Sequence, residues 1–492
     1  MEALGQITSL FFSFLTHRSE EWSLLSVPFF ATFVAFFAIY ILLCKQRQQA
    51  MQAYLIAFGL FFAFKANGTL MLLLPLTIIT SWYLTEKMMR LRKGRPRQMG
   101  LVLLIAIELL PLIHYKYTNF GLWIINDIFG SNLSFSKLFL PIGISFYTFQ
   151  AISYTVDVYR KTLDRRASLM EYTAYLTFFP LLFAGPIARA KHFIPQINQP
   201  RTTDKQLINK GLWLIICGLL KKSLIADYLV QFNDWVFADP TAFTGFENLM
   251  ATLGYTLQIY CDFSGYSDIA IGLAALMGIE LLDNFSFPYQ SLNLTEFWHR
   301  WHISLSTWFR DYVYIPLGGS RKGVFRTCLN SFLTMVVAGL WHGASVMFVL
   351  WGCLHGAGLV VHKIACRMGL NKIPNTLIIR VVSWLLTFGF VSLAWVFFRS
   401  PNLSTALAIF AQIGSDFSLA DFYPFLMTRP EWLILFGIGL ELHSIRKHDY
   451  DWMLQKFIAL PAFVKCLIFI AVLQLIINFS QNEVQPFIYT QF

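Results

Sequence analysis

Long apolar segments alternate with short polar connections along most of the chain. The clearest apolar windows cover residues 23–44, 69–84, 101–114, 211–232, 327–337, 346–361, 377–398 and 460–479. A straight helical crossing needs about 20 apolar residues, so the shorter windows indicate re-entrant or broken segments beside full spans. The pattern predicts an all-α polytopic membrane protein with roughly ten to twelve transmembrane or re-entrant helices around a central tunnel, and a single multi-pass domain over residues 1–492.

Composition and charge support this class and exclude two others. Of the 492 residues, 56% are hydrophobic and 13% are charged, a balance that argues against a set of soluble domains. The formal net charge of +11 does not indicate nucleic-acid binding, because the Lys and Arg residues lie in short connections between apolar segments. The densest of these connections, residues 87–97, is expected on the cytoplasmic side. Seven cysteines without a C-x-x-C pair argue against a disulfide framework or a cysteine metal site.

Two segments combine polar residues with helix breakers inside apolar sequence. Residues 138–160 contain Pro141, Gly143 and a series of Ser, Thr, Tyr and Gln side chains, and are too polar to face lipid. Residues 178–189 contain two prolines and Gly185, which exclude one continuous helix. Broken backbone of this kind is expected to pack in protein or to line a cavity.

Two carboxylates interrupt the apolar segment 257–276. Asp262 and Asp268 need partners or water in such a setting. One interpretation is structural: Ser264 or Ser267 caps a helix that begins near Asp268, whose carboxylate stabilises the positive helix end. The other interpretation is that the two carboxylates give a cavity its polarity and contact substrate.

The segment 297–319, FWHRWHISLSTWFRDYVYIPLGG, is rich in Trp, Tyr and basic residues. Its early part, 298–310, predicts an amphipathic helix at the membrane interface. His299 and His302 have the i, i+3 spacing that would let them share a metal. No third ligand accompanies them at a diagnostic spacing, so we predict no metal site.

A single histidine stands in the small-residue turn GLWHG at 339–343. A polar residue inside apolar sequence is by default a candidate for function, although His342 would also fit as a core residue bonded to a backbone carbonyl. Arg326 is sixteen positions earlier. As one helix this distance is about 24 Å of a hydrocarbon core of about 30 Å, and a break at Gly339 or Gly343 would place the histidine at a shallower depth. Either geometry lets His342 meet one reactant from the cytoplasm and another from outside.

The tail 480–492 ends in the aromatic sequence NEVQPFIYTQF. Its Tyr489 fits an interfacial anchor, a common use of Phe and Tyr. A short tail after Pro486 also has the length to fold back towards a pocket.

Three stretches together resemble the membrane-bound O-acyltransferase superfamily: DFSGYSDIAIGLA, FWHRWHISLSTWFRDYVYIPLGG and GLWHG. The resemblance covers residues 138–361 and points to the bacterial branch that contains alginate and peptidoglycan O-acetyltransferases and the teichoic-acid D-alanylation acyltransferase. It implies that His342 is the catalytic histidine and that His302 is the histidine of the W-H-I-S motif. His299 inherits no role, because the family usually has another residue there.

The tail resembles a C-terminal Phe-x-Tyr-x-x-Phe motif of related acyl-export systems. The matching residues are Phe487, Tyr489 and Phe492. The resemblance implies that Tyr489 carries the acyl group transiently.

The chemistry of acyl transfer fits these residues independently of the resemblance. A hydroxyl attacks a thioester poorly until a base removes its proton, typically an effect of about 10²- to 10⁴-fold. Neutral histidine suits this task near pH 7, and a tyrosine phenol, with a pKa of about 10, loses its proton more easily than a sugar hydroxyl. We therefore predict His342 as the base, with His302 assisting positioning or protonation. The candidate substrate-binding residues are Trp298, Trp341, Asp262 and Asp268.

The predicted function is a membrane O-acyltransferase that supplies acyl groups, with acetyl expected, for an extracytoplasmic polysaccharide. The donor substrate would be an acyl-CoA thioester from the cytoplasm, without a tightly bound cofactor. The resemblance implies that the protein lies in the bacterial cytoplasmic (inner) membrane, in contact with membrane lipid. It also implies an extracytoplasmic SGNH-hydrolase-like partner that completes transfer to the glycan. The alternative is a transporter or channel for a small polar solute or an acyl-bearing molecule. A transporter would show paired broken helices in two related halves, which the sequence does not display.

Overall fold

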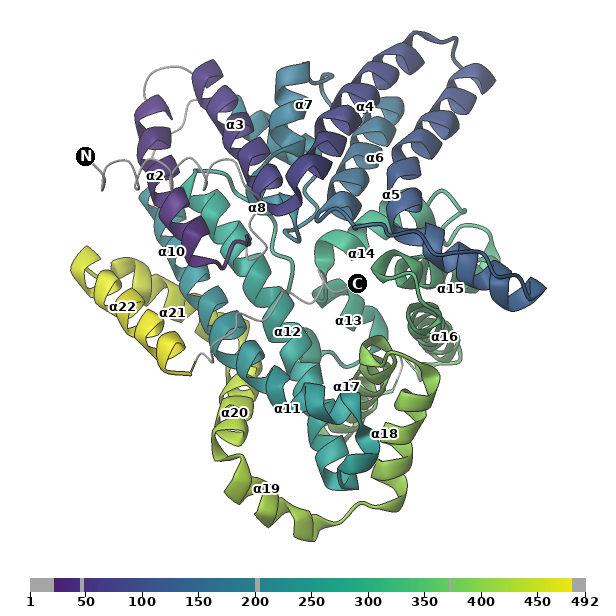
Figure 1. The fold of residues 1–492 in the computed structure, drawn as a ribbon, viewed down its shortest axis with the longest axis vertical. Coiled ribbons are helices and arrows are strands. Elements are labelled where there is room, and N and C mark those ends of the chain that lie inside the picture. Colours follow the sequence, from purple (N-terminus) through teal and green to yellow (C-terminus); the bar gives the residue numbers. More distant parts are fainter. Residues whose placement is uncertain (1–21, 45–47, 200–203, 371–372, 375, 480–492) are drawn as a thin grey trace. The chain divides into compact units, whose positions relative to one another are not determined.

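The computed structural model describes residues 22–44, 48–199, 204–370, 373–374 and 376–479 (Figure 1). All regular secondary structure within these ranges is helical, which confirms the predicted all-α class. Backbone contacts divide the chain into two compact units, Met1–Asp204 with Met277–Leu281, and Lys205–Leu276 with Leu282–Phe492. A single functional domain over residues 1–492 stays a prediction.

Several helices have the length and apolar composition to cross a membrane. Within the described ranges there are six: Gln48–Arg90, Arg95–Phe129, Gly323–His342, Val346–Arg367, Leu377–Arg399 and Ala462–Phe479. A seventh span is formed if the bent pair Leu403–Ser415 and Leu419–Thr428, with 100° between its helices, counts as one broken span. The chain is thus a multi-pass membrane protein that combines full spans with shorter and broken apolar helices. The predicted central tunnel stays a prediction.

The first unit has an aromatic core. Its elements are α2 (Val27–Cys44), α3 (Gln48–Asn67), η1 (Gly68–Leu72), α4 (Leu73–Arg90), α5 (Arg95–Phe129), α6 (Ile144–Arg160), α7 (Leu169–Leu176), α8 (Phe179–Leu182) and α9 (Ala190–Ile197). The ring of Phe179 lies 5.0 Å from that of Phe58 and 5.7 Å from that of Phe62. Most residues of α6 are buried, as the polar sequence of 138–160 predicted. The four-residue α8 confirms that 178–189 is not one helix.

The second unit contains the residues predicted to carry the chemistry. Its elements are α10 (Lys205–Leu219), η2 (Leu220–Ala226), α11 (Asp227–Ala238), η3 (Pro240–Ala242), α12 (Gly245–Leu276), η4 (Pro288–Gln290), α13 (Leu294–Arg300), α14 (Ile303–Phe309), η5 (Arg310–Tyr314), α15 (Gly323–His342), α16 (Val346–Arg367), α17 (Leu377–Arg399), α18 (Leu403–Ser415), η7 (Leu419–Asp421), α19 (Phe422–Thr428), α20 (Pro430–Ser444), α21 (Lys447–Ala459) and α22 (Ala462–Phe479). Two of them, η2 and η5, are π-helical.

Glycines bring the backbones of α10 and α12 into contact along their length (Figure 1). A β-carbon on Gly218 would lie 2.6 Å from the carbonyl oxygen of Gly265, and one on Gly211 would lie 2.8 Å from that of Gly272. The two glycines of each helix are seven residues apart, so they share one helix face. Only a residue without a side chain permits this approach. The contact fixes α12 as the central helix against which the neighbouring charges of α10 and η2 are buried.

The helices α15 and α16 form a hairpin whose arms also meet through glycines. A β-carbon on Gly352 would lie 2.5 Å from the carbonyl oxygen of Met335, and one on Gly339 would press against the carbonyl oxygen of Phe348. The first arm runs through Gly339 and ends at His342, so of the two breaks that the sequence allowed, the one at Gly343 is confirmed. The second arm begins at Val346, and the Ser345 hydroxyl caps it by accepting the Met347 N–H. His342 therefore lies at the tip of the hairpin.

Two predicted helix boundaries are wrong. The segment 298–310 is not one amphipathic helix, because Trp301 is extended and His302 is left-handed with φ of 41°, which separates α13 from α14. Trp301 is moreover buried in the protein, so it does not lie on an exposed interfacial face. The helix α12 does not begin near Asp268, so the capping interpretation of that residue is wrong as well.

Candidate active site

The imidazole of His342 is surrounded by aromatic rings. Its side chain is 3% exposed. The ring centroid lies 5.0 Å from Trp341, 5.0 Å from Trp351 of α16 and 5.2 Å from Phe398 of α17, and each of these rings stands nearly perpendicular to the imidazole. Edge-to-face packing of this kind fixes the plane of the imidazole. The three rings therefore hold a histidine in one orientation at the end of α15.

His302 occupies a strained turn that other residues hold in place. Its left-handed backbone is costly for a non-glycine residue, of the order of 1–3 kcal/mol. Asn284 secures the turn: its carbonyl accepts the Ile303 N–H at 2.9 Å, and its side-chain oxygen accepts the Ser304 N–H at 3.2 Å and the Ser304 hydroxyl at 2.9 Å. Strain kept in this way is typical of functional sites.

Trp341 connects the two predicted histidines. Its ring lies 5.0 Å from that of His342 and 6.2 Å from that of His302, and the His302 ring also lies 4.5 Å from the Phe263 ring of α12. Complete burial lowers the pKa of His302 to about 3. His302 is therefore neutral near pH 7 and is better suited to hydrogen bonding than to proton donation.

A third buried histidine lies in the same group of rings. His355, in the second arm of the hairpin, has its ring 4.8 Å from Trp351 and 5.2 Å from Trp298. Neither of its ring nitrogens has a hydrogen-bond partner among the described residues. We call His302, His342, His355, Trp298, Trp341 and Trp351 the histidine cluster. Sequence reasoning missed His355, although the triplet Leu354-His355-Gly356 in apolar sequence carries the same signal as the GLWHG turn.

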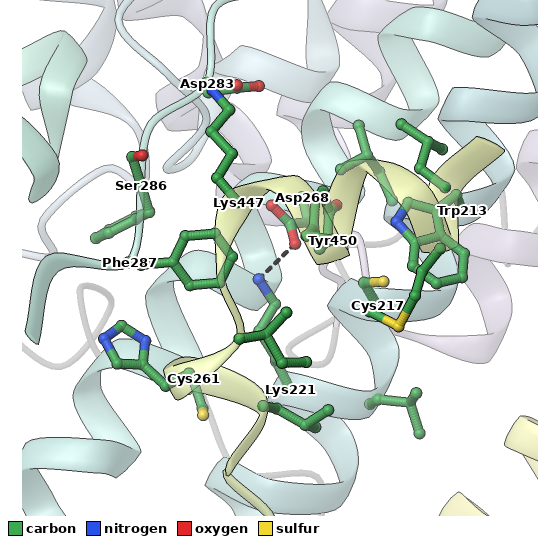
Figure 2. Close-up of a pocket in the computed structure, with 18 of the residues that line it drawn as sticks. Trp213, Cys217, Lys221, Cys261, Asp268, Asp283, Ser286, Phe287, Lys447 and Tyr450 are labelled. Atoms are coloured by element: carbon green, nitrogen blue, oxygen red, sulfur yellow. Dashed lines mark ion pairs between the residues drawn. The ribbon is translucent and has the colours of Figure 1, made fainter. Parts of the chain in front are cut away.

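The structure places Asp262 and Asp268 beside two lysines of η2. Lys222 is 1% exposed and binds both Asp262, at 2.6 Å, and Asp227, at 2.5 Å. The neighbouring Lys221 binds Asp268 at 2.5 Å (Figure 2). We call these five residues the Lys–Asp layer. The π-helical turn η2 turns both consecutive lysines towards α12.

The lysines and Asp227 were not predicted, because residues 211–232 read as one apolar segment. The consecutive Lys221 and Lys222 within it were the available signal. A substrate-binding role for Asp262 and Asp268 stays a prediction.

Two other site predictions have different outcomes. Tyr489 lies outside the described residues, so its role stays a prediction. His299 is exposed at the end of α13. Among the residues that the structure describes, no group of three or more His, Cys, Asp or Glu side chains is placed to hold a metal ion.

Comparison with known proteins identifies the family. Residues 60–400 match the membrane-bound O-acyltransferase family. The chain is 40% identical to the probable alginate O-acetylase of Pseudomonas aeruginosa over 366 residues, 73% of this chain and 69% of the relative. It is 35% identical to the peptidoglycan O-acetyltransferase of Helicobacter pylori over 382 residues, 72% of each chain.

A more distant relative has a different named reaction. The teichoic acid D-alanyltransferase of Bacillus subtilis is 28% identical over 273 residues, 52% of this chain and 68% of the relative. Acyl transfer is common to all three relatives, and the family match decides between the predicted enzyme and the alternative of a transporter or channel. The chain belongs to the membrane-bound O-acyltransferase family and is an O-acyltransferase.

Proposed function

We propose that this enzyme moves an acyl group, with acetyl expected, from a cytoplasmic acyl-CoA thioester to a hydroxyl destined for an extracytoplasmic polysaccharide. The names of the alginate and peptidoglycan relatives support the acetyl group and the polysaccharide. The bacterial cytoplasmic membrane is the proposed location. An extracytoplasmic SGNH-hydrolase-like protein is the proposed partner for the final transfer to the glycan.

The position of His342 is the observation that carries this proposal. It ends a continuous 20-residue helix that begins directly after the basic pair Arg321 and Lys322. Such a helix is about 30 Å long, close to the thickness of the hydrocarbon core. With the basic pair on the cytoplasmic side, this length supports a base that meets the donor from one side and the acceptor from the other.

In the proposed reaction His342 accepts the proton of the acceptor hydroxyl while the hydroxyl oxygen bonds to the thioester carbonyl carbon. Collapse of the tetrahedral intermediate breaks the carbon–sulfur bond, and the proton passes from the imidazolium to the leaving thiolate. The neutral His302 positions the acceptor or the base through Trp341, rather than donating a proton. Trp298 and Trp341 are proposed to contact the bound substrate.

The test of this assignment is turnover of labelled acyl-CoA by membranes or purified enzyme. His342→Ala is expected to lower the rate by about 10²- to 10⁴-fold, because the hydroxyl loses its base. His299→Ala is the matched control, since it removes an exposed histidine 3 residues from His302 and should keep the normal rate. Normal turnover in a well-expressed His342→Ala enzyme would contradict the assignment.

Tyr489 is proposed as a transient acyl carrier. Its phenol ester would remain activated enough to pass the acyl group onward. Mass spectrometry of the C-terminal peptide, after donor exposure without acceptor, should find the acyl group on Tyr489 in the enzyme with His342 intact. An unmodified peptide under these conditions would rule out the relay while leaving the base assignment unaffected.

A further inference from the structure

A cavity of about 570 Å³ lies within the second unit, and residues of α21 form part of its lining. Its walls come from α10, η2, α12, the segment 283–287, the end of α20 and α21 (Figure 2). The volume is in the range of sites that hold small organic molecules. One part of the lining is apolar, with Leu214, Leu220 and Leu454 among its residues. The cavity therefore suits a ligand that is only partly polar.

Charges of both signs line the same cavity in equal number. The charged lining residues are Lys210, Lys221, Lys447, Asp268, Asp283 and Asp451. Lys221 and Asp268 neutralise each other in the wall. Lys447, Asp283 and Asp451 are exposed at the rim. A ligand with a large net charge of either sign would find no matching excess of the opposite charge.

A buried hydrogen-bond donor also belongs to the wall. His443 lines the cavity and is 5% exposed. Its Nε2 accepts the backbone N–H of Tyr289 at 3.0 Å, so the neutral ring carries its proton on Nδ1. Burial, together with Lys221, lowers the pKa of His443 to about 3, which keeps the ring neutral. The Nδ1–H is buried and has no hydrogen-bond partner among the described residues, so an oxygen of a bound ligand would satisfy it.

The neighbouring helices indicate that the cavity lies at the depth of the membrane surface. α21 carries Trp452, which is 57% exposed and has the Lys456 ammonium 5.5 Å from its ring centroid. Exposed Trp beside Lys is typical of the lipid–water interface. After a break at Pro461 the chain continues as α22, an apolar span with 6% of its most apolar window buried. Lipid is therefore the molecule most available to the cavity.

We propose that this cavity binds the headgroup of a zwitterionic glycerophospholipid of the phosphatidylethanolamine type. The phosphate oxygens accept from His443 Nδ1–H and from the Lys447 ammonium. The ammonium of the lipid lies by Asp283 and Asp451, and the glycerol end of the acyl chains follows the leucines. The wall residue Asn284 also secures the turn of His302, so the lipid is a neighbour of the candidate active site. Lipid binding itself does not depend on the proposed acyl transfer.

Native mass spectrometry of the full-length protein tests the proposal. The protein is delipidated in detergent and offered equal amounts of dioleoyl phosphatidylethanolamine and dioleoyl phosphatidylglycerol. The natural protein should retain the zwitterionic lipid preferentially. Asp283→Lys combined with Asp451→Lys gives the rim an excess of positive charge and should shift the ratio towards phosphatidylglycerol by about fivefold.

Asp449→Lys is the matched control. Asp449 is exposed on the same helix but does not line this cavity, so the same charge change there should leave the lipid ratio unaltered. His443→Phe should weaken retention of phosphatidylethanolamine because it removes the buried donor. If the double variant does not fold, Asp451→Lys alone, on the exposed side of α21, should shift the ratio in the same direction.

Three results would overturn the proposal. The first is equal retention of both lipids by the natural protein. The second is a shift in Asp449→Lys as large as that in the rim variants, which would show a general surface-charge effect. The third is displacement of the lipid by a soluble oligosaccharide, which would identify the cavity as a glycan site. His342→Ala should retain the lipid normally, so failure of the proposed catalytic function and failure of lipid binding are distinguishable.

Discussion

The histidine cluster and the Lys–Asp layer lie in the same unit, yet they bury polar groups with different neighbours. In the layer, Asp262 and Asp268 of α12 meet the ammonium groups of η2 across a helix contact, and Asp227 meets Lys222 five residues along the same helical run, all at 2.5–2.6 Å. In the cluster, the described neighbours of the imidazoles are mainly indole and phenyl rings. Pairing lowers the cost of burying the charges and stabilises both partners in their charged forms. Burial among rings disfavours the charged form of an imidazole, and the neutral form is the one that can act as a base.

The first prediction concerns the layer and is expected to have the largest effect on stability. Lys222→Met removes the ammonium that binds both Asp262 and Asp227, and takes this partner from the buried Asp262 and the half-buried Asp227. The expected loss is about 3–5 kcal/mol. The loss of stability is measured by thermal unfolding of the detergent-solubilised protein, with size-exclusion chromatography as the readout of the folded fraction.

Adding Asp262→Asn and Asp227→Asn should recover part of the stability of Lys222→Met, because no buried charge is then left unpaired. A melting temperature of Lys222→Met equal to that of the natural protein would show that the layer is not paired as described.

The second prediction concerns the cluster and affects turnover more than stability. Asn284→Ala removes the side-chain oxygen that holds Ser304 beside the left-handed His302. Misplacement of the turn should reduce kcat by about tenfold to a hundredfold, with a smaller change in KM. Asn293→Ala, which removes the cap of α13 at Glu296 N–H, is the control and should cost about 1 kcal/mol of stability with kcat retained. Equal losses of kcat in both variants would show that the Asn284→Ala effect comes from general destabilisation and not from misplacement of the His302 turn.

The third prediction tests the backbone contact that buries the layer. Gly218→Ala would place a β-carbon 2.6 Å from the carbonyl oxygen of Gly265, so α10 must move away from α12. The expected destabilisation is roughly 1–3 kcal/mol. Gly389→Ala on α17, where no heavy atom would lie within 4 Å of the new carbon, should instead be neutral or slightly stabilising. The comparison of the two unfolding midpoints decides whether the contact is as close as described.

The fourth and smallest effect comes from an ion pair in the first unit that is open to solvent on one side. The Arg165 guanidinium, together with the Ser168 N–H, lowers the pKa of Glu171 from 4.5 to about 2. A lowered carboxyl pKa stabilises the fold above about pH 4.5, and this contribution is lost as the pH falls towards about 2. The effect is small because the Arg165 side chain is 60% exposed.

Glu171→Gln should therefore show a weaker decline of melting temperature over this pH range than the natural protein. A decline of equal steepness in both proteins would assign acid sensitivity to other carboxylates.

Apolar length and helix breakers made the fold class and several breaks predictable. Pro180 and Gly185 predicted the interruption after α8, and Gly343, one of the two breaks that the sequence allowed, ends α15, because these residues act locally on the backbone. The break at His302 was not predictable in this way. No Gly or Pro marks it, and the turn depends on Asn284, which is 18 positions earlier in the chain.

The sequence likewise predicted some parts of the candidate site and not others. Motif resemblance led to His302 and His342, and the structure brings both to Trp341. The charges of Asp262 and Asp268 were noticed, but their partners could not be known before α10 was seen to pack against α12. Partner identity is a tertiary property, and two consecutive lysines in an apolar window were the one local hint.

The α15–α16 hairpin limits where residues can be inserted into or deleted from the chain. Its arms are locked by backbone contact at Gly339 and Gly352, so neither arm can slide along the other. Inserting one residue in α15 before His342 would rotate the imidazole about 100° around the helix axis and out of its aromatic surroundings. Insertions and deletions are therefore expected to be tolerated in the surface connections long before they are tolerated between Gly323 and His342.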